Sequence, residues 1–364
     1  MNGYRQQLDQ LRAARNFRAI PADSVGSDLV DLSGNDYLGI AADGALKAEF
    51  FNSLGGEMPA LSASASRLLA ADQAEFSKLE SLLADLYRRP VLLFNSGYHA
   101  NSGSIAALAK GRTLIVADKL VHASIIDGMM LSKADFERFR HNDVSHLRRI
   151  LAKRAGDYER VLIVCESVYS MDGDFAPLAE IAASKTANSL LYVDEAHAFG
   201  VSGRDGLGLA VDMPEVDVII GTLGKAAGSV GAFAAVRSND LRDYLVNTAR
   251  SLIFSTALPP INCAWSRFVI ERIPSMTDRR EQLGLLAAEL ARILRRQEPS
   301  HIQPLITGSS ESALELSARL SRGGFKVLPI RTPTVPPGTE RLRFSLSASL
   351  TLSQLQPLET LLYS

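Results

Sequence analysis

The stretch Ile219-Ile220-Gly221-Thr222-Leu223-Gly224-Lys225-Ala226-Ala227-Gly228 joins the end of a strand-like, β-branched run to a small, glycine-rich segment. Most lysines are solvated surface charges, and that is the alternative interpretation of Lys225. Its neighbours are apolar residues and glycines, however, so no polar surroundings explain it. We therefore expect Lys225 to face a cavity at the end of a strand.

The same kind of run recurs on both sides of this stretch. Short, continuously apolar segments lie at residues 91–94, 113–117, 161–165, 190–193 and 218–220. This pattern is typical of strands in a sheet that is covered on both faces. Helical patterns separate the runs, as between residues 71 and 89, where apolar residues recur every three or four positions. The alternation predicts an α/β fold with a mostly parallel central sheet and right-handed crossovers.

Two regions fall outside this alternation. We predict an N-terminal helix and segment at residues 1–40, a large α/β domain at 41–258 and a smaller α+β domain at 259–364. Residues 331–338 are too rich in proline for regular structure and are expected to form an ordered loop.

The composition excludes several classes of protein. The chain has 364 residues, 46% of them hydrophobic, and a formal net charge of −1. Near-zero charge gives no electrostatic reason to expect a nucleic acid or an acidic membrane as partner. The 2 cysteines form no disulfide framework, and the N-terminus lacks a signal-peptide pattern. We expect a cytoplasmic protein and predict no metal site.

Asp194 and His197 follow the apolar run at residues 190–193. A carboxylate at the end of a buried strand is unfavourable unless a cation or several donors meet it. An amine and a strand-end carboxylate are the pair that pyridoxal phosphate needs, for a Schiff base and for the pyridinium nitrogen. A structural salt bridge or a helix cap is the alternative for Asp194. His197 could donate to an oxygen substituent of the ring.

Other polar residues follow the predicted strands, and ligands bind open α/β sheets at the carboxyl ends of their strands. Gly97 and Tyr98 open a helix whose N-terminus suits a phosphate. His122 could stack on a heteroaromatic ring, whereas Ser170 and Thr222 offer hydroxyl groups. For each residue an ordinary turn, a helix cap or a solvated side chain is the alternative.

Arg343 lies in the alternating run Arg341-Leu342-Arg343-Phe344, which predicts a strand. We expect one of its two arginines to point inward and the other outward. An inward Arg343 could bind the carboxylate of an amino acid with two hydrogen bonds. A surface arginine is the alternative, and the alternation does not choose the face.

Taken together, several motifs resemble the α-oxoamine synthases, a family of fold-type I pyridoxal-phosphate enzymes. The resemblance runs from about residue 32 to residue 350, and its ordered motifs make coincidence very improbable. They are Ser33-Gly34-Asn35-Asp36-Tyr37-Leu38-Gly39, Asn95-Ser96-Gly97-Tyr98-His99-Ala100-Asn101, His141-Asn142-Asp143-Val144-Ser145-His146-Leu147, Ser170-Met171-Asp172-Gly173-Asp174, Val193-Asp194-Glu195-Ala196-His197 and Thr222-Leu223-Gly224-Lys225.

The resemblance implies four catalytic residues and pyridoxal 5'-phosphate as cofactor. Lys225 would form the Schiff base and remove the substrate's Cα proton. Asp194 would pair with the pyridinium nitrogen, His197 would contact the phenolic oxygen, and His122 would stack over the ring. The remaining cofactor contacts would come from Gly97, Tyr98, Ser170 and Thr222.

The resemblance also implies partners and a substrate site. Thr256 would reach the phosphate of the neighbouring subunit, which implies a homodimer with shared sites. Arg343 would hold the amino acid carboxylate, and Arg18 and Thr334 match positions that contact substrate. The substrates would be an amino acid and an acyl thioester. The acyl group would be attached to coenzyme A or to an acyl carrier protein.

Within the family, Phe254-Ser255-Thr256-Ala257-Leu258-Pro259-Pro260 and the compact N-terminus look most like the member of the biotin pathway. That member joins L-alanine to a pimeloyl thioester with loss of carbon dioxide. Members that use glycine or serine, an aminotransferase of the same fold and a non-catalytic relative are the alternatives. The chain departs from the family pattern at Ser62–Arg67, Ala198 and Ser347–Leu350, and these differences could alter the fit of the acyl substrate.

Overall fold

The computed structural model describes residues 2–20 and 28–363 and divides the chain into two compact units. The larger unit comprises Leu38–Ser170 and Asp174–Arg280. The smaller unit comprises the chain before Leu38, the short segment Met171–Gly173 and the chain from Glu281.

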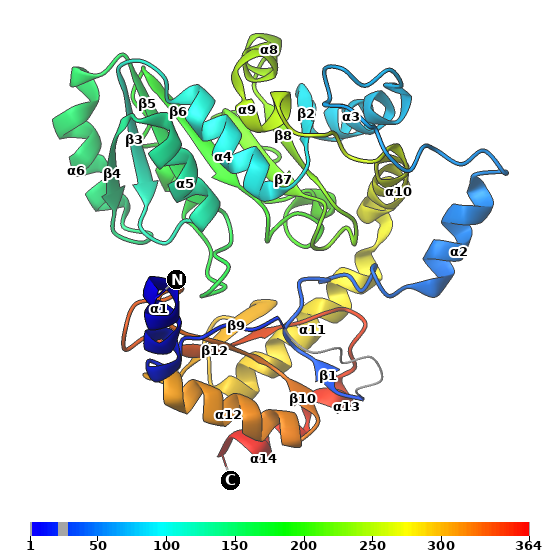
Figure 1. Ribbon diagram of the computed structural model, residues 1–364, viewed down its shortest axis with the longest axis vertical. Coiled ribbons are helices and arrows are strands. Elements are labelled where there is room, and N and C mark those ends of the chain that lie inside the picture. The colour runs from blue at the N-terminus through cyan, green and yellow to red at the C-terminus, as the bar shows by residue number, and fades with distance from the viewer. Residues whose placement is uncertain (1, 21–27, 364) are drawn as a thin grey trace. The chain divides into compact units, whose positions relative to one another are not determined.

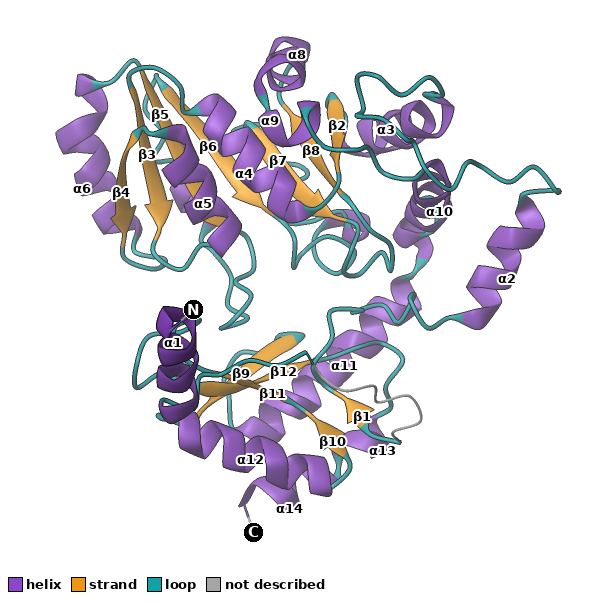
Figure 2. Cartoon of the chain, viewed as in Figure 1, coloured by secondary structure: helices purple, strands orange, loops and turns teal. Residues whose placement is uncertain are grey.

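The larger unit is built on one seven-stranded sheet (Figures 1 and 2). In spatial order its strands are β2 (Val91–Phe94), β8 (Ala232–Val236), β7 (Val218–Thr222), β6 (Ser189–Asp194), β5 (Arg160–Glu166), β3 (Thr113–Asp118) and β4 (Asp135–Phe139). The strands from β7 to β4 are parallel, and β8 is antiparallel to both of its neighbours. The predicted mostly parallel α/β sheet is therefore confirmed.

Sequence patterns missed two strands of this sheet. β8 is rich in alanine, which has little preference for strands, and it forms through pairing on both sides. β4 is an edge strand whose sequence Asp135-Phe136-Glu137-Arg138-Phe139 is largely charged. Both strands therefore form because they pair with neighbouring strands, and not because of their own sequence pattern.

The larger unit also contains nine α-helices in the part of the chain that is described, several of which connect the strands and cover the sheet. They are α2 (Gly44–Ser53), α3 (Ala74–Tyr87), α4 (Gly97–Leu108), α5 (Ala123–Ser132), α6 (Val144–Arg154), α7 (Leu178–Ala182), α8 (Asn239–Thr248), α9 (Arg250–Ile253) and α10 (Pro260–Ile270). α4 and α5 lie on the face of the sheet turned to the viewer in Figure 1. Ile105 of α4 and Ile125 of α5 share one buried core with Ile115, Val164 and Ile220 of the strands.

The smaller unit contains two small sheets. β12 (Arg341–Ser345) pairs antiparallel with β11 (Leu328–Ile330) and β9 (Ile302–Ile306), and β1 (Val30–Asp31) pairs with β10 (Phe325–Lys326). Its helices are α1 (Asn2–Ala13), α11 (Thr277–Leu294, whose first residues belong to the larger unit), α12 (Ser310–Arg322), α13 (Leu352–Leu355) and α14 (Pro357–Tyr363).

The observed division differs most from the expected bounds at the start of the C-terminal domain. We expected the smaller domain to begin at residue 259, but the smaller unit takes up the chain at Glu281. The reason is α10, whose buried residues include Cys263, Phe268 and Val269 and which belongs to the larger unit. In the part of the chain that is described, no helix is long and apolar enough to cross a membrane.

Candidate active site

A cavity of about 150 Å³ lies where strands β3, β5, β6 and β7 end. Most of the predicted cofactor residues line it, and they come from loops and helix ends far apart in the sequence. The lining residues are Gly97, Tyr98, Asn101, His122, Ser124, Glu166, Asp194, Ala196, His197, Thr222 and Lys225. Strand ends in a parallel sheet meet at one edge, which explains why the sequence rule found them.

The carboxylate of Asp194 is buried and held in a fixed orientation. Its Oδ2 accepts a hydrogen bond of 2.7 Å from the side-chain amide of Asn101, and its Oδ1 accepts one of 2.9 Å from the backbone N–H of Ala196. Asn101 is itself fixed, because its Oδ1 accepts a 2.8 Å hydrogen bond from the hydroxyl of Tyr192. These donors offset the cost of burying the charge.

The amine of Lys225 lies 2.8 Å from Nε2 of His197. Lys225 is half-buried and follows β7, whereas His197 is buried and follows β6. A hydrogen bond at this distance fixes the amine relative to the imidazole ring. The structure therefore brings the predicted amine, histidine and carboxylate to one cavity.

His122 and Glu166 form a second contact across the cavity. His122 caps α5, and its backbone N–H donates to Oε1 of Glu166 over 2.5 Å. Desolvation lowers the pKa of the His122 imidazole, and Nδ1 lies 2.7 Å from the hydroxyl of Ser124. Burial, and then the nearby charge of Asp194, raise the pKa of Glu166 well above its ordinary value.

The N-terminus of α4 closes another side of the cavity. Ser96 caps the helix and accepts from the backbone N–H of His99, and Gly97 and Tyr98 follow it. A β-carbon added to Gly97 would lie 3.7 Å from the side chain of Thr222, so the two residues are close neighbours. The Tyr98 hydroxyl donates to the carboxylate of Asp127, and this hydrogen bond raises the pKa of Tyr98.

Two predicted cofactor residues do not line the cavity. Ser170 lies beyond β5, at the point where the chain passes into the smaller unit. Thr256 is exposed and pairs with Ser66 in an isolated bridge, and its carbonyl accepts from the side chain of Asn95.

The predicted substrate residues belong to the smaller unit. Arg18 donates to the hydroxyl of Thr334 over 2.8 Å, so two of them are in direct contact. Arg343 is buried in β12 and donates to Oδ1 of Asn35 over 3.1 Å.

The expectation that Arg341 and Arg343 point in opposite directions is wrong. Residues two apart in a strand project from the same face. Both residues are buried: Arg341 is 5% exposed and Arg343 is 4% exposed. Arg341 pairs with Asp172, whereas Arg343 binds Asn35, all within the smaller unit.

Sequence reasoning gave no role to Asn101, Ser124 or Glu166, which also line the cavity. Asn101 lies in α4 among apolar and small residues, and a lone amide on a buried helix is the signal that could have identified it. Glu166 is the last residue of β5, as Asp194 is of β6, and the same strand-end rule applies to it.

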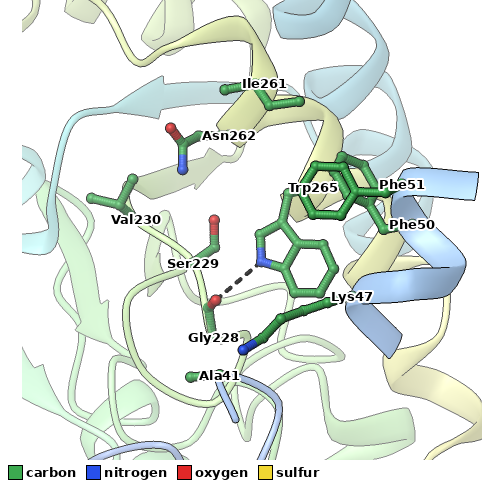
Figure 3. A pocket seen from close by; sticks show the side chains of 10 residues that line it. All are labelled: Ala41, Lys47, Phe50, Phe51, Gly228, Ser229, Val230, Ile261, Asn262 and Trp265. Carbon is green, nitrogen blue, oxygen red and sulfur yellow. Dashed lines mark hydrogen bonds between the residues drawn. The ribbon is translucent and has the colours of Figure 1, made fainter. Parts of the chain in front are cut away.

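A second cavity of about 420 Å³ lies elsewhere in the larger unit and contains none of the predicted residues. Figure 3 shows Phe50 and Phe51 of α2, Trp265 of α10 and the Lys47 side chain around it. The indole N–H of Trp265 donates to the carbonyl of Gly228 over 3.0 Å.

Comparison with known proteins identifies the family. Residues 27–359 match the family described as "Aminotransferase class I and II". A "Putative 8-amino-7-oxononanoate synthase" of Pasteurella multocida (strain Pm70) is 45% identical over 373 residues, which cover 97% of this chain and 96% of that protein. A protein of Glaesserella parasuis serovar 5 (strain SH0165) with the same description is 46% identical and covers 96% of this chain, with 97% of its own length matched.

Solved structures agree. A serine palmitoyltransferase of Sphingomonas wittichii superposes with a TM-score of 0.88 at 29% identity, over 98% of this chain and 94% of that one. An 8-amino-7-oxononanoate synthase from Francisella tularensis superposes with a TM-score of 0.76 at 27% identity, over 92% of this chain and 96% of that one. The chain therefore belongs to the family of 8-amino-7-oxononanoate synthases, enzymes of the fold-type I, pyridoxal-phosphate-dependent α-oxoamine synthase group.

Proposed function

We propose that this enzyme condenses L-alanine with a pimeloyl thioester and releases carbon dioxide and free thiol, forming 8-amino-7-oxononanoate for biotin synthesis. The observation that carries the proposal is the meeting of Lys225, His197 and Asp194 in one cavity of a chain 45% identical to proteins so described. The identity extends over nearly the whole length of both chains.

The residues of the cavity fit pyridoxal phosphate. Asp194 supplies a buried carboxylate already oriented by two donors, Lys225 supplies an amine, and the N-terminus of α4 supplies free N–H groups for a phosphate. Bound there, the cofactor supplies an electron sink for breaking bonds at the amino acid's Cα. We assign the ring nitrogen to Asp194, the phenolic oxygen to His197 and the ring face to His122.

Proton transfer falls to Lys225 in this proposal. Its amine removes the Cα proton of alanine and later returns a proton to the product. His197 Nε2, at 2.8 Å, holds the amine in position within the cavity. Asp194, oriented by Asn101, would meet the ring nitrogen.

Substrate binding is assigned to the smaller unit. Arg343 would bind the carboxylate of alanine, because its guanidinium is a two-pronged donor set in a buried strand. We expect Arg343→Gln to raise KM for alanine at least tenfold, the cost of about one charge-assisted hydrogen bond. KM for the thioester should stay within twofold, and an equal rise in both would contradict the assignment.

We further propose a homodimer in which Thr256 of each subunit reaches the cofactor phosphate of the other. Thr256 is exposed and lies outside the cavity of its own chain. Two large side chains are also exposed: Phe254, close to Thr256 in the sequence, is 69% exposed, and Tyr98, on the cavity wall, is 47% exposed. A second subunit would cover such side chains.

Two experiments test the function. The protein is incubated with pyridoxal phosphate, reduced with sodium borohydride and digested, and the modified peptide should contain Lys225. Lys225→Ala should abolish the modification, whereas Lys47→Ala, a lysine of the second cavity, should not. Modification retained in Lys225→Ala would refute the Schiff-base assignment.

The second experiment offers L-alanine, glycine and L-serine separately with pimeloyl coenzyme A and with a pimeloyl carrier protein. Release of thiol and carbon dioxide is expected with alanine. Glycine or serine as the sole active amino acid would assign the chain to another α-oxoamine synthase. Serine is included because a serine palmitoyltransferase superposes on this chain with a TM-score of 0.88.

A further inference from the structure

A cluster of charged residues stands beside the candidate active site and outside its cavity. His141 lies between two carboxylates, with Nδ1 3.0 Å from Oδ1 of Asp118 and Nε2 2.7 Å from Oδ2 of Asp174. Its neighbour Asn142 donates its backbone N–H to Asp118 and its side-chain amide to Asp174, both over 2.9 Å. The edge of the Tyr169 ring packs on the imidazole, with ring centroids 4.4 Å apart.

Both ring nitrogens of His141 face carboxylates, so the imidazole must carry two protons to satisfy both contacts. Burial alone would lower the pKa of His141, but the hydrogen bonds and charges of Asp118 and Asp174 outweigh it and raise the pKa to about 10. The side chain is therefore a cation throughout the neutral range. Asp118 is fully buried, so removing the imidazole of His141 would leave a buried carboxylate without its cation and destabilise the fold.

The bridge joins two segments that approach the cavity from different strands. Asp118 ends β3, and its Oδ1 also accepts from the backbone N–H of Leu120 in the turn that leads to His122. Asp174 lies on the segment after β5, where its carbonyl accepts from the backbone N–H of Tyr169, next to Ser170.

The second segment is a narrow loop closed on itself. Val168 and Phe175 form an isolated antiparallel bridge, and the backbone N–H of Ala176 donates to Ser167 over 3.0 Å. Asn142 donates to the carbonyl of Phe175 over 3.2 Å, so His141 and Asn142 together hold the returning limb. The loop begins directly after Glu166, whose side chain lines the cavity.

We propose that His141 is a positioning residue of the cofactor site, which bridges Asp118 and Asp174 and thereby fixes the segments that carry His122 and Ser170. It touches neither the cavity nor any residue assigned to chemistry in the proposed function, and it acts through the two carboxylates. The proposal rests on the proposed function only for its cofactor readout.

The test compares full-length wild type with His141→Asn, Asp174→Asn and the double variant. His146→Asn is the matched control, because His146 is a nearby histidine whose ring accepts the backbone N–H of Arg140. Two quantities are measured: amide hydrogen exchange in residues 167–176 without cofactor, and the dissociation constant of pyridoxal phosphate from pH 7 to 10.5.

We expect His141→Asn to speed exchange in residues 167–176 about tenfold and to weaken cofactor binding about tenfold at pH 7. The ratio of the dissociation constants should fall towards one as the pH passes about 10, because wild type then loses the same cation. The double variant should be no worse than His141→Asn, and His146→Asn should match wild type.

Unchanged exchange in His141→Asn would overturn the proposal. So would faster exchange with cofactor affinity within twofold of wild type, or an affinity ratio that does not vary with pH. If wild type itself binds no pyridoxal phosphate, the proposed function fails, and the exchange rates alone decide whether His141 fixes the loop. Should His141→Asn not fold, Asp174→Asn, which leaves Asp118 paired, carries the same comparison.

Discussion

Glu195 follows Asp194 and is fully buried, which makes it a sensitive probe of the larger unit's stability. Its carboxylate oxygens accept hydrogen bonds from the backbone N–H groups of Leu209, over 3.0 Å, and Ala210, over 2.7 Å. Burial nevertheless raises the pKa of Glu195 to about 7 from its ordinary 4.5. The perturbation is Glu195→Gln, which removes the titration and leaves a side chain of similar volume.

The magnitude follows from linkage. Between pH 4.5 and about 7 the folded chain keeps the Glu195 proton, whereas the unfolded chain has lost it. Stability therefore falls as the pH rises through this window, because the unfolded state binds fewer protons. The two pKa values, about 7 in the folded chain and 4.5 in the unfolded chain, differ by an amount that corresponds to roughly 3 kcal/mol. This contribution is fully present below pH 4.5 and is lost above pH 7.

The assay is urea unfolding of the cofactor-free protein at intervals from pH 4.5 to pH 8, followed by the fluorescence of Trp265, the only tryptophan. Glu195→Gln should be less stable at low pH, because its amide faces a backbone N–H, and this deficit should shrink by about 3 kcal/mol as the pH rises. Glu215→Gln, at an exposed position, is the control for the change in net charge. A difference between wild type and Glu195→Gln that stays constant within about 0.5 kcal/mol would refute the reasoning.

Three further outcomes are expected. The free energy of unfolding should be higher for wild type than for His141→Asn, by at most about 5 kcal/mol. This difference, measured by urea unfolding, should be complete below pH 6.5 and disappear as the pH rises through about 10. Gly221→Ala should destabilise the protein by about 1–3 kcal/mol in the same assay, because the new β-carbon would lie 2.2 Å from the buried Phe233 ring, whereas Gly156→Ala meets nothing within 4 Å and should be near neutral. Asn101→Leu should cost about 2–4 kcal/mol and weaken cofactor binding, since it removes the hydrogen bonds of the amide to Ser124, Asp194 and Tyr192. Retention of wild-type affinity in a titration would exclude that role.

The strand-end rule predicted most of the cavity, because the position of a residue after a buried strand is visible in the sequence. Asp194, His122 and Thr222 were found in this way, and the structure places them around one cavity. Asn101 was missed because it lies inside a helix and reaches Asp194 over 93 positions of sequence. Only the packing of α4 on the sheet brings the two residues together.

Other errors have different physical causes. The strand β8 escaped notice because its alanines carry no strand signal, and pairing with β2 and β7 determines it. The opposite faces assigned to Arg341 and Arg343 contradicted the period of two in a strand. The role of Thr256 at the phosphate of a second subunit stays a prediction.

The position of Lys225 between β7 and β8 has a consequence for the order of folding. Those two strands are antiparallel neighbours, and Thr222 bonds to Gly231 across only 9 positions of sequence. Contacts this local form early and at small cost in chain entropy, whereas the 93-position contact between Asn101 and Asp194 must wait for the sheet to assemble. We therefore expect the β7–β8 pair, whose connection contains Lys225, to form before Asn101 reaches Asp194.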